Sequence, residues 1–117
     1  MVTPLLLSAE VQGPPGSVSH ASALAFLTAW LQAGHQVHRV FFYHDAVLEA
    51  ADIRSAWKTL SDRHGIELAV CVGAAERRGA GAAVDARYPI RAPFEIVGLG
   101  QLVEAIDRSD RFITFAP

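Results

Sequence analysis

Residues 66–79 read IELAVCVGAAERRG, a short apolar run followed by small residues and a basic pair. The run 66–70 is typical of a buried strand, and residues 73–78 predict a short helix that ends at Gly79. Cys71, the only cysteine of the chain, therefore lies where the strand gives way to the helix. In open parallel sheets, ligands and chemistry gather at the carboxyl ends of the strands. A lone cysteine nevertheless behaves most often as a small apolar side chain, so position alone favours a structural role for Cys71.

Strand-like and helix-like segments alternate on both sides of this stretch. The expected strands are short and apolar, and they cover residues 5–7, 37–42, 66–70, 94–97 and 111–115. The expected helices repeat apolar residues every three or four positions, and they cover residues 20–33, 52–64, 73–78 and 99–106. Alternation through short connections predicts a three-layer α/β/α sandwich with a five-stranded parallel sheet.

Two of the helices carry apolar stripes that we expect to face the sheet. The first consists of Ile53, Ala56, Trp57 and Leu60, and the second of Leu99, Leu102, Val103 and Ile106. Before the first helix, Gly and Pro in residues 10–16 predict a loop, and Ser17 or Ser19 offers an N-cap. Residues 80–93 form a Gly/Ala-rich connection that we expect to be mobile.

The carboxyl ends of parallel strands share one edge of the sheet, which brings several segments together. The segments expected there are residues 10–16, Tyr43, His44, Asp45, Cys71 and residues 98–100. The distance from the Tyr43 segment to Cys71 depends on strand order, which the sequence leaves open. His44 could tune a thiolate or be a solvated loop histidine, and Asp45 could orient His44 or cap the next turn. Arg77 and Arg78 lie about 9–10 Å further along the helix axis, so we expect them to face solvent or a partner.

The composition bounds the class of protein. The 117 residues are 51% hydrophobic with a formal charge of -2, which favours one domain over residues 1–117. No apolar run approaches the roughly 18 residues of a membrane span, and the first residues lack the basic start of a signal peptide, so we expect a cytoplasmic protein. Without a basic tail or face, direct nucleic-acid binding is not expected. The large apolar fraction suggests that other subunits cover part of the surface.

Cofactor and metal motifs are missing from the sequence. Neither G-x-x-x-x-G-K-[ST] nor G-x-G-x-x-G follows the first strand, and residues 16–19 (GSVS) match a flavin phosphate loop only weakly. The five histidines show no metal-ligand spacing, and a single cysteine permits neither an internal disulfide nor a C-x-x-C mechanism. We therefore expect no cofactor and no metal.

Several segments together resemble the DsrE/TusD family of sulfur-relay proteins. They are residues 39–47 (RVFFYHDAV), 68–79 (LAVCVGAAERRG), 98–102 (GLGQL) and 110–115 (DRFITF). The middle segment is the most specific, since it matches the family's pattern of strand, cysteine, small residues and Arg-Arg-Gly. Two departures are Ala46, where a glycine is common, and the connection at residues 80–93, which is shorter than usual.

The resemblance implies a DsrEFH-like fold and a persulfide on Cys71, with Tyr43, His44 and Asp45 as supporting residues. It implies a TusA-like sulfur donor and a TusE-like or DsrC-like acceptor. It also implies a heterohexamer with TusB-like and TusC-like subunits that serves 2-thiouridine formation in tRNA. DsrE-like subunits of the same type serve sulfur oxidation, and some subunits of such complexes are non-catalytic scaffolds. A redox sensor oxidised at Cys71 is a further alternative.

Overall fold

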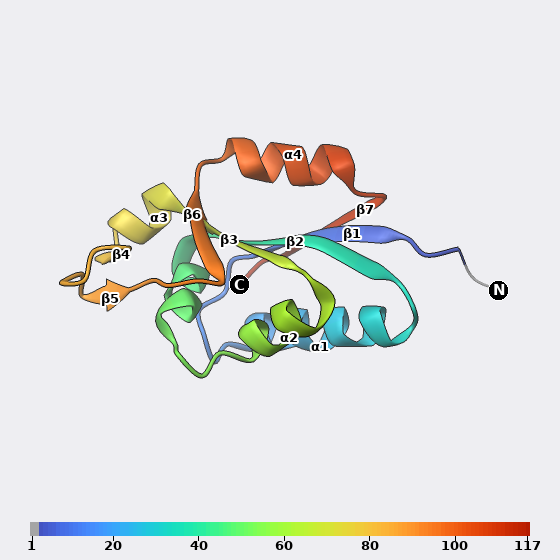
Figure 1. Cartoon of the computed structure of the whole chain (residues 1–117), viewed down its shortest axis with the longest axis horizontal. Helices are drawn as coiled ribbons and strands as arrows, with labels where there is room; N and C mark the ends of the chain where they lie inside the picture. The colour runs from blue at the N-terminus through green and yellow to red at the C-terminus, as the bar shows by residue number, and fades with distance from the viewer. Residues whose placement is uncertain (1–2) are drawn as a thin grey trace.

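Five parallel strands form the central sheet in the order β6-β3-β2-β1-β7 (Figure 1). The structure is a computed structural model that describes residues 3–117, and the first two residues, used above to argue against a signal peptide, lie outside it. The strands are β1 (Leu6–Val11), β2 (Gln36–Phe42), β3 (Glu67–Cys71), β6 (Phe94–Val97) and β7 (Arg111–Phe115). Every neighbouring pair is parallel, which confirms the predicted sheet.

Helices cover both faces of this sheet, as predicted. Helices α1 (Val18–Gln32) and α2 (Ala56–His64) lie on one face, and α4 (Gly100–Arg108) lies on the other (Figure 1). The crossovers through α1 and α2 step in one direction, from β1 to β2 to β3, whereas the crossover through α4 returns from β6 to β7. A right-handed crossover that reverses its direction places its helix on the opposite face.

The first strand and the second helix differ from their predicted bounds. The strand β1 extends to Val11, so Glu10 belongs to the sheet rather than to the following loop. A 3-10 helix, η1 (His44–Ala51), follows β2 directly. The helix α2 begins only at Ala56, because the side chain of Ser55 accepts the N–H of Trp57 and caps the helix there. Ile53 consequently lies outside the helix and is 83% exposed rather than packed on the sheet.

The apolar stripe predicted for α4 is only partly buried. Leu102 and Ala105 pack inward, but Leu99, Val103 and Ile106 are exposed. An ionic layer lies beneath the helix, where Arg39 of β2 donates to Gln101 O at 2.9 Å and pairs with Glu104 and Glu67. Burial lowers the pKa of Arg39, but the two carboxylates more than offset it and raise that pKa. The buried charge therefore takes the place of the expected apolar contacts.

The connection at residues 80–93 contains regular structure. The short helix α3 (Val72–Glu76) follows β3, and β4 (Ala80–Gly81) then pairs in parallel with β5 (Tyr88–Pro89). This small two-stranded sheet lies beside α3 at one end of the molecule (Figure 1). Both β4 and β5 contact η1, so the connection packs against the segment that follows β2. Its mobility stays a prediction.

Candidate active site

The strand order brings the Tyr43 segment next to Cys71. The strand β2 neighbours β3, and Phe42 pairs with Val70 in their register. Extending that register by one residue places Tyr43, whose backbone is extended, beside Cys71 at the carboxyl edge. On its other side Cys71 pairs with Val97 of β6. The structure thus brings the Tyr43 segment and Cys71 together at this edge and supplies the neighbour relation that the sequence left open.

The thiol of Cys71 belongs to the α4 face of the sheet. Glu67 reaches the ionic layer under α4, and side chains two residues apart on a strand point to the same face. Cys71 therefore shares the orientation of Glu67. The same alternation along β2 puts Tyr43 on this face with Phe41, and their ring centroids lie 6.1 Å apart.

Cys71 is buried, with only 4% of its surface exposed. A persulfide relay needs a thiol that its partners can reach, and this burial does not provide one. The residue ends a strand that lies between β2 and β6, and Ala74 and Ala75 of the following helix are buried as well. Its side chain makes no cap hydrogen bond to α3. A partner can reach the sulfur only after the groups that cover it have moved.

Asp45 and Arg78 link the two segments that flank Cys71. The Arg78 Nε donates to Asp45 Oδ1 at 2.7 Å, and the Arg78 Nη1 donates to Ala74 O at 3.0 Å. Asp45 therefore neither orients His44 nor caps the turn, and Arg78 does not face solvent freely as expected. The ion pair ties the end of α3 to the start of η1.

Arg77 is exposed, as expected, but its side chain does not extend away from the site. A Cβ built on Gly73 would lie 3.5 Å from Arg77 Nη1. The guanidinium thus lies over the first turn of α3, because helical side chains lean toward the N-terminus. The rise along the axis therefore overstated the separation between this charge and the Cys71 end of the helix.

His44 is exposed and takes an unusual backbone conformation, with φ at 50°. A left-handed conformation costs a residue with a Cβ roughly 1–2 kcal/mol, so the surrounding structure must impose it. The ring of His44 packs against Tyr43, with centroids 4.3 Å apart. Its exposure fits the interpretation of His44 as a solvated loop histidine. The strained residue forms the turn that follows Tyr43.

Comparison with known proteins adds to this geometry. A family model for DsrE/DsrF-like proteins matches residues 10–115. The chain belongs to the DsrE/DsrF-like family. This membership confirms the resemblance seen in the sequence.

Relatives of this DsrE/DsrF-like chain carry sulfurtransferase names. The chain is 40% identical to the "Sulfurtransferase TusD homolog" of Pseudomonas aeruginosa, over 87% of this chain and 90% of the relative. It is 39% identical to the "Sulfurtransferase TusD" of Sodalis glossinidius, over 90% and 94% of the two chains. It is 36% identical to the "Putative sulfurtransferase DsrE" of Allochromatium vinosum, over 89% and 92%. The crystal structure of the ychN protein from E. coli shares the fold, with a TM-score of 0.69 and 19% identity over 97% of this chain and all of that one.

The DsrE/DsrF-like chain also holds a buried polar cluster that the sequence did not predict. The Nδ1 of His20 makes a hydrogen bond of 2.9 Å with Gly13 O. Its Nε2 accepts a hydrogen bond of 3.0 Å from Trp57 Nε1. Glu49 of η1 lies 3.4 Å from the same Nε2. The cluster fixes the loop after β1 to η1 and α2. Its only sequence signal was a histidine four residues after the Gly13–Gly16 turn.

Within residues 3–117, no group of three or more His, Cys, Asp or Glu side chains is arranged to hold a metal ion. Over the same residues, no helix combines the length and apolar character needed to cross a bilayer.

Proposed function

We propose that this chain is a TusD-type sulfurtransferase subunit that carries a persulfide on Cys71 and relays sulfur between carrier proteins. The observation that carries the proposal is the position of the single cysteine at the carboxyl edge of β3, beside Tyr43, in a family whose relatives are named sulfurtransferases. A relay needs one thiol and no cofactor, because each step exchanges one sulfur–sulfur bond for another.

The relay consists of two balanced exchanges. The Cys71 thiolate attacks the outer sulfur of a donor persulfide, the donor's sulfur–sulfur bond breaks, and the donor thiolate leaves. A thiolate of the acceptor then attacks the outer sulfur on Cys71, and the Cys71 thiolate leaves in turn. Neither step consumes an oxidant or a reductant.

Burial of Cys71 adds a requirement to this chemistry. Since 4% of the residue is exposed, the sulfur must be uncovered before each exchange. The short helix α3 is the element best suited to move, because it spans only five residues and follows Cys71 directly. The Arg78–Asp45 pair, which holds the end of α3 to η1, opposes that movement. Docking of a carrier would supply the free energy that opens this end of the molecule.

The partners we infer are a TusA-like donor and a TusE-like acceptor, with TusB-like and TusC-like subunits in a cytoplasmic heterohexamer that serves 2-thiouridine formation in tRNA. The exposed apolar side chains of α4, Val103 and Ile106, and of its N-cap residue Leu99 offer surface that neighbouring subunits could cover. A DsrE-like role in sulfur oxidation, with a DsrC-like acceptor, is the second candidate, favoured by the 36% identity to the Allochromatium vinosum relative.

Mass spectrometry of the chain after incubation with a persulfide-loaded TusA-like donor tests the proposal. The expected result is a gain of one sulfur atom on Cys71, removed again by the acceptor. The Cys71→Ser variant should fold but gain nothing, and Tyr43→Phe should load more slowly. Loading of Cys71→Ser to the wild-type extent would refute the relay, and restoration of tRNA thiolation in cells by Cys71→Ser would identify a scaffold instead.

A further inference from the structure

A cleft lies between α1 and α2 at the edge of the sheet opposite Cys71. Its volume is about 310 Å³, and it is lined by Thr28, Leu31, Gln32, Leu60, Arg63 and His64. These residues belong to the C-terminal halves of the two helices, which lead into the amino ends of β2 and β3. The volume is at the lower end of the range for small-molecule sites. The relay proposed above uses none of these residues.

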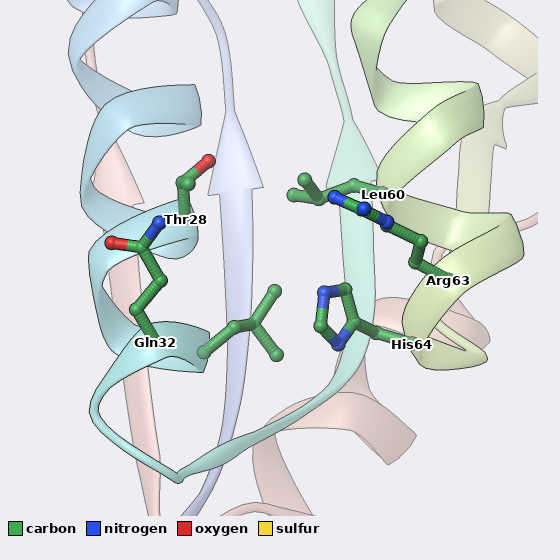
Figure 2. Close-up of a pocket in the computed structure, with 6 residues that line it drawn as sticks. Thr28, Gln32, Leu60, Arg63 and His64 are labelled. Carbon is green, nitrogen blue, oxygen red and sulfur yellow. The ribbon is translucent and has the colours of Figure 1, made fainter.

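The side chains of α2 point across the cleft toward α1. Figure 2 shows Leu60, Arg63 and His64 projecting from α2, with Thr28 at the edge of α1 that faces them and the amide of Gln32 turned away from α2. Leu31 of α1 adds a second apolar surface beside Leu60. The two helices thus provide an apolar lining with polar groups around it.

Arg63 gives the cleft a positive charge, and none of its lining residues is a carboxylate. Among residues 3–117, no salt bridge involves Arg63 or His64. The hydroxyl of Thr28 already donates to Leu24 O at 2.7 Å, so the donors that face a ligand come from Arg63 and His64. A guanidinium presents paired donors that match a carboxylate, and a charge-assisted hydrogen bond is about twice as strong as a neutral one.

We propose that this cleft binds a small organic anion, a carboxylate on a short apolar chain. The guanidinium of Arg63 receives the carboxylate, assisted by His64. Leu31 and Leu60 contact the apolar chain. The arrangement combines a few polar groups with apolar lining, as small-molecule sites do.

Hexanoate serves as the probe in a titration of the full chain followed by amide chemical shifts. We expect shifts at the cleft residues and a dissociation constant in the millimolar range, because so few ligand atoms limit the affinity. Hexylamine lacks the anion and inorganic phosphate lacks the apolar chain, so each should bind at least fivefold more weakly. Equal binding of either probe would overturn the proposal.

Arg63→Gln is the decisive variant, and Arg54→Gln is its matched control. Arg54 is an exposed arginine in the turn before α2 and does not line the cleft. Loss of one charge-assisted hydrogen bond at a partly exposed site should weaken hexanoate binding about five- to tenfold in Arg63→Gln and leave Arg54→Gln unchanged. Because Arg63 also favours the dipole of α2, the ligand-free spectrum checks the helix separately. A second variant, Leu60→Asn, should weaken hexanoate binding but not phosphate binding. Wild-type affinity in Arg63→Gln would refute the site.

Discussion

Replacing Asp45 with asparagine should make the buried thiol of Cys71 react faster. The Asp45 carboxylate holds Arg78 at 2.7 Å, and Arg78 in turn holds the carbonyl of Ala74, so the pair fastens α3 beside η1. Cys71 precedes α3 directly and is 4% exposed, so alkylation requires this end of the molecule to open. Weakening the Asp45–Arg78 pair raises the population of the open state, in which Cys71 is accessible.

The size of the effect follows from the exposure of the pair. The side chains of Arg78 and Asp45 are 25% and 56% exposed, so solvent screens their attraction. Exposed pairs contribute roughly 0.2–1 kcal/mol, and the partly buried Arg78 places this one at about 0.5–1 kcal/mol. Since 1.4 kcal/mol corresponds to a factor of ten, the open population should rise about two- to fivefold. Global stability should fall by no more than the same free energy.

The rate of alkylation of Cys71 by iodoacetamide, measured under native conditions, is the assay. Asp45→Asn removes a negative charge, which by itself also favours a thiolate, whereas Arg78→Gln removes a positive charge. An opening mechanism predicts that both variants react two- to fivefold faster, while a purely electrostatic one predicts opposite effects. Asp62→Asn on α2, an exposed aspartate, is the control and should react as the wild type does. A rate in Arg78→Gln at or below that of the wild type would refute the opening mechanism.

Three further predictions concern stability. The hydrogen bond from Arg39 lowers the pKa of Glu104 in the folded protein. The ionised Glu104 therefore stabilises the fold fully above about pH 4.3, the usual pKa in the unfolded chain, and this stabilisation is lost as the pH falls through the lower pKa of the folded state. Acid titration of the unfolding free energy should therefore be less steep in Glu104→Gln, and an unchanged slope would contradict this. His44→Gly should raise the unfolding free energy by about 0.5–1 kcal/mol in denaturant titrations, because glycine adopts a positive φ without strain, whereas His44→Ala should not. Trp57→Phe should lower the unfolding free energy by about 1–3 kcal/mol, since His20 loses its hydrogen-bond donor and the core loses ring volume. A loss below about 0.5 kcal/mol would exclude a structural role for the hydrogen bond between Trp57 and His20.

The strands were predictable because each is a short apolar run whose pattern survives any tertiary arrangement. Residues 68–71 are the clearest case, since their apolar character follows from burial on both faces of a parallel sheet. The first strand was underestimated because Ser8 and Glu10 interrupt its apolar run, and both find polar partners across the sheet, Ser8 in the N–H of Arg39 and Glu10 in Thr114. The apolar pattern of the sequence thus predicted the positions of the strands better than the residues at which they begin and end.

The helix faces were less predictable, since amphipathic spacing does not say what a helix packs against. The stripe Leu99, Val103 and Ile106 has the spacing of a core face, but Arg39 on the sheet pulls Glu104 inward and turns the stripe outward. Ile53 fits the helical spacing of α2, yet Ser55 caps the helix two residues later. In both places a specific polar contact outweighed the apolar pattern.

The sequence by itself determined the fold class, the family and the place of Cys71 at the end of a strand, because these depend on local patterns and on a motif written in consecutive residues. Only the tertiary structure decided that Tyr43 is the neighbour of that cysteine, that Arg78 pairs with Asp45 across 33 positions, and that the thiol is covered. Strand order, side-chain reach and burial arise from contacts between residues far apart in the chain, and no local pattern encodes such contacts.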